Sequence, residues 1–193
     1  MDQYLLFDIH INHVCKKVNG VLIYLNRIKD RLDRDTRLIV VQSLALSIIS
    51  YCLKVWGMTT KEQLDRVQKV QNFAARVAYG GLRKYDHVSP IFAELKWLYI
   101  EKKLMNDISI FAYKVCNKLL PDWLFSFATV GDHNVRPTRQ SSDLFISRTK
   151  TDIGARSISI RGAKIWNAIP QAVKDSNSLH VFRRKLKQYF LET

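Results

Sequence analysis

Polar and apolar residues follow helical periods along most of this chain, most regularly between residues 36 and 79. From Thr36 to Trp56 nearly every position is apolar, and the polar residues fall at steps of four, three and four, namely Ser43, Ser47, Ser50 and Lys54. A single polar stripe at 3.6 residues per turn predicts a helix that is buried over most of its circumference. A membrane span is the alternative, although the serines and Lys54 within the run disfavour it.

A second long helix is predicted over residues 60–79. Residues 59–63, Thr-Thr-Lys-Glu-Gln, have the spacing of a capping box, and the two glycines at 80–81 are typical of a helix end. Because residues 57–58 leave only a short connection, we expect the two helices to pack against each other in antiparallel fashion.

Three further helices are predicted, over residues 11–33, 100–120 and 179–191, with Asp35 as the expected cap of the helix that follows the first of these. Residues 129–162 differ, because glycine, proline, serine and asparagine interrupt any helical pattern. Within them, the runs 144–146 and 156–160 alternate or carry β-branched residues and favour a small β-hairpin.

The expected fold class is therefore mainly α. A helical unit occupies residues 1–128, and a small basic C-terminal tail with the candidate β-hairpin and a terminal helix occupies residues 129–193. Hydrophobic residues make up 47% of the chain and charged residues 25%, which is typical of a folded globular protein and not of a disordered one.

The net charge of +14 over 193 residues favours polyanionic partners such as nucleic acid. Residues 131–193 carry 12 Lys and Arg against 5 Asp and Glu, so the last third holds half of the excess charge. The three cysteines, Cys15, Cys52 and Cys116, are too few and too scattered for a disulfide framework, and no secretory leader is visible. We expect an intracellular protein, nuclear or cytoplasmic.

Several strings of residues resemble the jockey-like non-LTR retrotransposon polyproteins, in the thumb and C-terminal tail beyond the reverse transcriptase palm. The resemblance covers roughly residues 7 to 193. It is carried by His10-Ile11 with Lys16-Lys17, by Tyr51, Val55-Trp56-Gly57, Leu64 and Gln71-Asn72-Phe73-Ala74-Ala75-Arg76, by His87, Pro90, Leu95 and Trp97-Leu98, and by Gly162, Trp166-Asn167, Ile169-Pro170, Ser178 and Phe182. Ile169 stands where the family usually has leucine. The resemblance implies a helical, thumb-like bundle that contacts a template–primer.

Catalytic chemistry is not visible in the sequence. A polymerase needs two or three carboxylates to hold two metal ions, and the family's paired aspartates are absent here, as is its endonuclease. His10, His13 and Cys15 are candidate zinc ligands, but an ordinary helix start explains them better. Asp30, Asp33 and Asp35 are candidate magnesium ligands, but local ion pairing and helix capping explain them better. We expect no enzymatic activity, no metal and no cofactor.

The sequence thus predicts a non-catalytic fragment of an RNA-directed DNA polymerase that binds the backbone of RNA or DNA, duplex or hybrid, without base specificity. Backbone contact requires Lys and Arg alone. The predicted nucleic-acid-binding residues are Arg66, Lys69, Arg76, Arg83, Lys84, Arg156, Arg161, Lys164, Arg183 and Arg184. Trp166 could stack on a base, but anchoring the tail to the core is the favoured role. A separate palm fragment is a further candidate partner. The alternatives are a helical protein-interaction module and a decayed reading frame without selected function.

Overall fold

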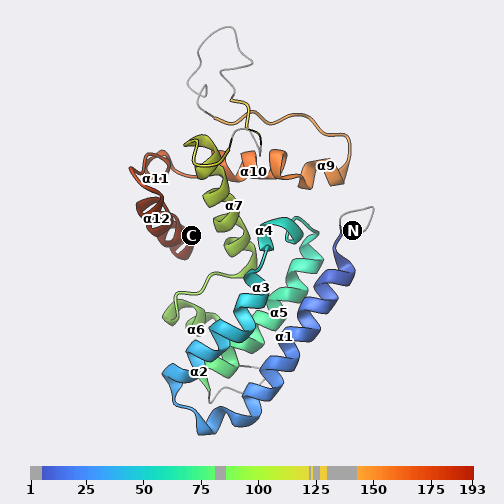
Figure 1. Ribbon diagram of the computed structural model, residues 1–193, viewed down its shortest axis with the longest axis vertical. Helices are drawn as coiled ribbons and strands as arrows, with labels where there is room; N and C mark the ends of the chain where they lie inside the picture. The colour runs from blue at the N-terminus through green and yellow to red at the C-terminus, as the bar shows by residue number, and fades with distance from the viewer. Residues whose placement is uncertain (1–5, 81–85, 122, 124–126, 130–142) are drawn as a thin grey trace. The chain divides into compact units, whose positions relative to one another are not determined.

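The computed structural model describes residues 6–80, 86–121, 123, 127–129 and 143–193 (Figure 1). These residues are mostly helical, which confirms the predicted mainly α class. The chain divides into two compact units, Met1–Lys103 and Leu104–Thr193. The boundary that the sequence suggested after residue 128 lies inside the second of these units.

The first unit is built on three helical segments that lie side by side (Figure 1). The first segment is α1, the second is the chain of short helices from α2 to α4, and the third is α5; a shorter helix, α6, follows. Their bounds are α1 Asp8–Ile28, η1 Lys29–Arg31, α2 Arg34–Val40, the π-helical η2 Val41–Leu46, α3 Ser47–Ser50, α4 Leu53–Trp56, α5 Lys61–Tyr79 and α6 Ser89–Glu94.

The predicted apolar faces of α1 and α5 form much of the core of this unit. On α1 the buried residues recur every three or four positions and are Ile11, Val14, Val18, Leu22 and Leu25. On α5 they include Leu64, Val67, Ala74 and Ala78, which follow steps of three, seven and four along the helix predicted over residues 60–79. Burial of each such stripe, rather than helix propensity, provides most of the stability of a helix of this length.

The segment between residues 34 and 56 is not the single continuous helix that the pattern predicted. The Ser50 hydroxyl donates to the Leu46 carbonyl at 2.8 Å, and Ser47 donates likewise to Ser43. Side-chain bonds to the carbonyl four residues back tend to bend a helix. The helix ends at Ser50, Cys52 adopts a left-handed conformation with φ 51°, and the short helix α4 begins at Leu53.

The expectation that this segment is buried on most of its circumference was also wrong. Ile39, Leu44, Tyr51 and Val55 are all more than half exposed. The segment packs against α1 and α5, but these contacts leave the four residues largely exposed. No helix in the described part of the chain is long and apolar enough to cross a membrane.

Two of the predicted helix caps are placed differently in the structure. Asp33, not Asp35, caps α2: its carboxylate accepts a 3.0 Å hydrogen bond from the Thr36 amide. Hydrogen bonding from Thr36, first from its side chain and then from its amide, holds the pKa of Asp33 below its usual value. Thr60 occupies the N-cap position of α5 but makes no capping bond with its side chain. The buried Thr59 instead donates to the Leu6 carbonyl at 2.6 Å, so a tertiary contact replaces the predicted capping box.

Arg37 joins the ends of three helical segments. Its guanidinium donates to the Lys29 carbonyl at 3.0 Å and to the Tyr79 carbonyl at 3.3 Å. The second bond places the start of α2 beside the end of α5, which confirms the predicted antiparallel packing. Gly80 ends α5 with φ 72°, and a Cβ at this position would come within 2.8 Å of the Arg37 guanidinium. Glycine is therefore required here both for the backbone conformation and for the approach of Arg37.

An aromatic cluster packs α6 against the end of α5. Phe92 is buried, and its ring stacks on Tyr99 at 4.5 Å and meets Trp97 edge-on at 6.1 Å. The start of the next helix, α7 (Ile100–Cys116), is tied to α5 by Gln68, whose side-chain oxygen accepts from the Ile100 amide at 2.8 Å. Gln71 adds a 2.9 Å bond to the Leu98 carbonyl.

Among its described residues, the second unit contains most of α7 and the later helices α9 to α12. Their bounds are α9 Asp152–Arg156, α10 Ile158–Asn167, α11 Gln171–Lys174 and α12 Leu179–Glu192. On α7 the buried apolar residues include Ile100, Leu104, Ile108, Ala112 and Tyr113. Leu119, within the helix predicted over residues 100–120, lies beyond the observed helix end and is exposed.

Aromatic rings hold the C-terminal helices onto α7. Phe182 of α12 stacks on Tyr113 of α7 at 4.2 Å and packs against Trp166 of α10 at 6.0 Å. The Tyr113 hydroxyl donates to the Ser176 carbonyl at 2.7 Å. Burying one such aromatic side chain contributes roughly 1.5–3 kcal/mol. These contacts explain why the compact unit begins within α7 and not after residue 128.

The predicted β-hairpin is not formed by residues 144–146 and 156–160. Arg156 ends α9, which Thr151 caps through a 3.2 Å bond from the Gly154 amide. Ser157 is a non-helical junction, and α10 begins at Ile158. Most of the alternating isoleucine and serine residues therefore belong to the start of an amphipathic helix. A short apolar run of this kind is easily mistaken for a strand, because it is too short to show a helical period. Among the described residues, β-type pairing is limited to an isolated antiparallel bridge between Thr129 and Leu144.

Asn167, in the string that resembles the retrotransposon tail, fixes this bridge to α10. Its side-chain oxygen accepts from the Leu144 amide, and its side-chain nitrogen donates to the Leu144 carbonyl, both at 2.9 Å. The asparagine amide thus acts as a neighbouring strand would, and it pairs both backbone groups of a residue that is 3% exposed.

Candidate nucleic-acid interface

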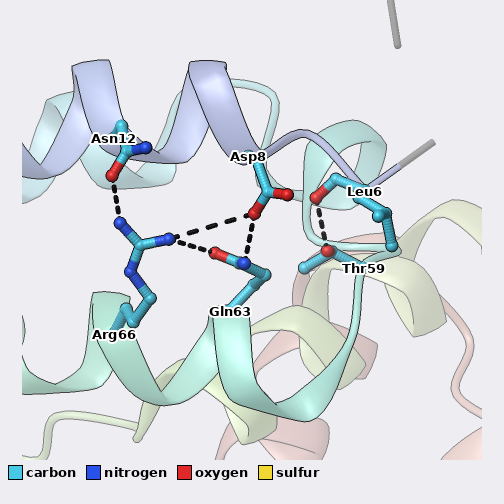
Figure 2. A network of polar contacts seen from close by, with 6 residues as sticks. All are labelled: Leu6, Asp8, Asn12, Thr59, Gln63 and Arg66. Carbon is cyan, nitrogen blue, oxygen red and sulfur yellow. Dashed lines mark hydrogen bonds and ion pairs between the residues drawn. The ribbon is translucent and has the colours of Figure 1, made fainter. Parts of the chain in front are cut away.

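Arg66 is held within the first unit by side chains of α1 and α5 (Figure 2). Its guanidinium donates to Gln63 at 2.7 Å and to Asn12, and it lies 3.9 Å from the Asp8 carboxylate. Gln63 also donates to Asp8, so one carboxylate receives both α5 side chains. Asp8 and Arg66 retain 46% and 37% of their side-chain exposure, so their attraction contributes about 0–1 kcal/mol.

This network explains the register of α1 and α5. Asp8 of α1 contacts Gln63 and Arg66 of α5. Asn12, one turn further along α1, contacts Arg66, which is nearly one turn beyond Gln63 on α5. The two helices therefore run in the same direction (Figure 2). Arg66 is consequently a structural residue in this conformation, with its donors bonded to Gln63 and Asn12. A phosphate would have to displace Asn12 or Gln63 to use the same donors.

The other two predicted cations of α5 lie in different surroundings. Lys69 is exposed, and it forms no hydrogen bond or ion pair with any other described residue. Arg76 is half-buried and donates to the Asp86 carbonyl at 3.1 Å. Arg83 and Lys84 lie outside the described residues. Of the three α5 cations that were predicted to share one binding side, Lys69 is therefore the one most accessible to a ligand.

The predicted cations of α9 and α10 are also unequal. Arg156 and Arg161 are half-buried, and both take part in interactions within the protein. Lys164 is exposed on α10, and its amino group has no partner in the described part of the chain. Trp166, on the same helix, is 6% exposed and covered by Phe182, which agrees with the anchoring role and leaves no open ring face for a base.

The last helix presents the most regular group of cations. Arg183 and Arg184 were predicted, and Lys187 joins them on the same side at helical steps of three and four, with His180 one turn before. All four are exposed, and none has a hydrogen-bond or ion-pair partner among the described residues. The opposite face of α12 is buried through Phe182, Leu186 and Phe190. We call His180, Arg183, Arg184 and Lys187 the α12 stripe.

Local features fix the direction in which the α12 stripe points. Ser178 caps the helix by accepting from the Val181 amide at 3.3 Å, and Phe182 is locked between Tyr113 and Trp166. Lys185, on a different side, donates to the Ala172 carbonyl at 3.2 Å. The stripe spans about 10 Å, since each helical residue adds about 1.5 Å. It can therefore meet several phosphates of one strand.

Sequence analysis did not identify the roles of three basic residues near these sites. Arg37 bonds two carbonyls, Arg34 pairs with Glu94 and lies 4.8 Å from the centre of the Tyr79 ring, and Lys174 lies 3.8 Å from Asp143. Arg34 and Arg37 had been interpreted as local partners of the nearby aspartates. Their actual partners are far away in sequence, and no local pattern indicates them.

The residues weighed as metal ligands do not come together. Nowhere in the described ranges do three or more His, Cys, Asp or Glu side chains gather closely enough to hold a metal ion. Cys15 lies beside Arg66; burial raises the pKa of its thiol, and the nearby guanidinium partly opposes that rise.

Comparison with known proteins adds no relative: no family model, curated protein or solved structure matches this chain. The similarity to retrotransposon polyproteins therefore stays a hypothesis that depends on the residue strings given above.

Proposed function

We propose that this chain binds the sugar–phosphate backbone of duplex or hybrid nucleic acid without base specificity, and that the α12 stripe provides the main contact. The supporting observation is the presence of three permanently charged, exposed side chains, Arg183, Arg184 and Lys187, on one side of a firmly anchored helix. Cations without internal partners can neutralise phosphates at little cost, and each one releases bound counterions.

The other predicted cations can be ranked in the same way, by their exposure and by whether their donors are already bonded. Lys69 and Lys164 are exposed and lack described partners, so they are the next candidates. Arg66 and Arg76 are expected to contribute less, because their donors are already engaged by Asn12, Gln63 and the Asp86 carbonyl. This differs from the sequence-based hypothesis, in which Arg66, Lys69 and Arg76 formed the central contact.

The choice of an RNA/DNA template–primer as natural ligand rests on the resemblance. The proposal that the chain is a polymerase fragment without its catalytic carboxylates rests on the resemblance as well. The same holds for a separate palm fragment as partner and for a nuclear or cytoplasmic location. Extension of a primed RNA template by the purified chain would contradict the non-catalytic part of the proposal.

The decisive experiment measures binding of a labelled RNA/DNA hybrid by fluorescence anisotropy over a series of salt concentrations. The variant R183Q/R184Q/K187Q should reduce the slope of log affinity against log salt by about two to three, since each phosphate contact contributes about 0.9 on duplex DNA. Scrambling the base sequence should leave the affinity unchanged, because backbone contacts carry no sequence information.

The matched control is K16Q/K17Q/R27Q, which removes the same charge from exposed positions of α1. If the two triple variants lower the slope equally, binding follows net charge and the α12 stripe is not a site. A chain that ignores the duplexes but self-associates in sedimentation would support the protein-interaction alternative instead. Far-UV circular dichroism checks that both variants remain folded.

A further inference from the structure

An apolar pocket opens in the first unit between the start of α1 and the helix break near Cys52. Its volume is about 710 Å³, within the range of small-molecule sites. The lining residues from α1 and its N-cap are Phe7, Ile9, His10 and His13, and those from the break and α4 are Cys52, Val55 and Trp56. All of these residues belong to a single compact unit, and none is among the predicted nucleic-acid contacts.

The pocket exists because the helix between residues 34 and 56 ends early. After Ser50 the chain turns at Tyr51 and Cys52, and the described residues leave Ile9 in the first turn of α1 83% exposed. Trp56 forms a firm wall: it is 3% exposed, and its indole nitrogen donates to the Tyr51 carbonyl at 2.8 Å. That bond also satisfies a carbonyl that the break removes from the helical ladder.

Two backbone conformations at the pocket are unfavourable for their residue types. Phe7 has φ 57° and Cys52 has φ 51°, both in the left-handed region, which bulky side chains rarely adopt. Such conformations persist only where the surroundings enforce them, and they are frequent at ligand sites. Phe7 lies on the α1 side of the pocket and Cys52 on the side of the helix break. The shape of the pocket is therefore set by contacts on both sides.

The polar groups of the pocket are suited to an anion. His10 and His13 are exposed, share one side of α1 at a spacing of three residues, and have no hydrogen-bond partner among the described residues. None of the described lining residues is acidic. Asp8, which lies close in sequence, is directed to Gln63 and Arg66 (Figure 2). Lys16 and Lys17, one turn beyond His13, add positive charge without a described partner.

We propose that this pocket binds a small anionic amphiphile, with its apolar body against Phe7, Val55 and Trp56 and its acidic group at His10 and His13. An imidazole donates a hydrogen bond to a carboxylate, and a hydrogen bond to a charged group is stronger than one between neutral groups. The excess of positive charge on the chain raises the local concentration of such a ligand. A cationic or neutral ligand would gain only the apolar contact.

Isothermal titration with decanoate, octanoate and neutral 1-decanol tests the ligand class. Decanoate should bind about 15-fold more tightly than octanoate if both extra methylenes are buried. It should also bind about ten-fold more tightly than 1-decanol, because the alcohol forms no charged hydrogen bond with the imidazoles. Equal affinities for decanoate and 1-decanol, or no binding of decanoate, would overturn the proposal.

Two exposed β-branched residues provide a matched pair of variants for locating the site. Val55→Glu places a carboxylate on the pocket wall and should weaken decanoate binding at least ten-fold, whereas Ile39→Glu makes a similar change on α2, outside the pocket, and should not. Bound decanoate should also slow alkylation of Cys52, which lines the pocket, but not that of Cys116. Equal effects of the two substitutions would place the ligand elsewhere.

The double variant H10A/H13A separates the head group from the apolar contact. It should still bind 1-decanol, which shows that the pocket is intact, but should lose the preference for decanoate. If the preference survives, the imidazoles do not hold the acidic group and the assignment fails. The outcome does not depend on nucleic-acid binding, since the α12 stripe lies in the other unit.

Discussion

Replacement of Asn167 by alanine should release the segment around Leu144 from α10. Leu144 is 3% exposed, and both of its backbone groups are paired with the Asn167 amide at 2.9 Å. Asn167 belongs to one of the residue strings that carry the resemblance to the retrotransposon tail. The structure gives this residue a physical role, which is to take the place of a missing neighbouring strand.

The size of the effect follows from the two lost bonds. A typical hydrogen bond contributes about 0.5–1.5 kcal/mol net, and a buried backbone group left without a partner costs about 1–3 kcal/mol. Water can reach the vacated site in part, so N167A should destabilise the contact by about 2–4 kcal/mol. N167D should cost at least as much, because a carboxylate can accept from the Leu144 amide but has no donor for its carbonyl.

Hydrogen exchange measured by mass spectrometry is the appropriate assay, since the Leu144 amide is protected through Asn167. A loss of 2 kcal/mol should accelerate exchange in a peptide covering residues 143–147 by about 30-fold, at 1.4 kcal/mol for each factor of ten. The control is N177A, an exposed asparagine with no hydrogen bond in the described part of the chain. If N167A leaves both this exchange rate and the urea midpoint unchanged, the strand-like role of Asn167 is refuted.

Two further predictions concern the first unit. Arg37→Ala removes charged hydrogen bonds to the Lys29 and Tyr79 carbonyls and should lower the free energy of unfolding by about 2–4 kcal/mol in urea titrations. The control is Arg31→Ala, which replaces an exposed arginine without a described partner and should change the free energy of unfolding little. Equal effects of the two substitutions would refute the stabilising role of Arg37. The pKa of Asp33 is lowered by hydrogen bonds from the side chain and the amide of Thr36, so its stabilising contribution is present above its unfolded pKa of about 4 and is lost as the pH falls through the folded value. The stability difference between the wild type and D33A should therefore shrink between pH 6 and pH 2.5, and a difference that stays constant would contradict this.

The amphipathic helices could be predicted from sequence because periodicity reports local geometry. A residue pattern at steps of three and four places apolar side chains on one face whatever that face later meets, and this predicted α1, α5 and α12 together with the end of α5 at Gly80. It failed at residues 156–160, where a run too short to show a period was assigned to a strand. It also failed at residues 51–52, where serine back-bonding and an indole bond end a helix within an apolar run.

The candidate site was also predicted from sequence only in part, and the rest was decided by tertiary structure. Sequence alone established an excess of positive charge and placed Arg183 and Arg184 on the outer face of a terminal helix, because that face follows from the buried positions of the same helix. Whether a given cation is accessible was decided only by tertiary structure. Two partners of Arg66, Asn12 and Asp8, lie on α1, more than 50 residues away in sequence. The Tyr79 carbonyl is 42 residues from Arg37, and the pocket at Trp56 joins residues about 45 positions apart. A polar side chain bonds to whatever group the packed helices bring within about 3 Å, and that proximity is fixed by the packing of the whole unit and not by any local pattern.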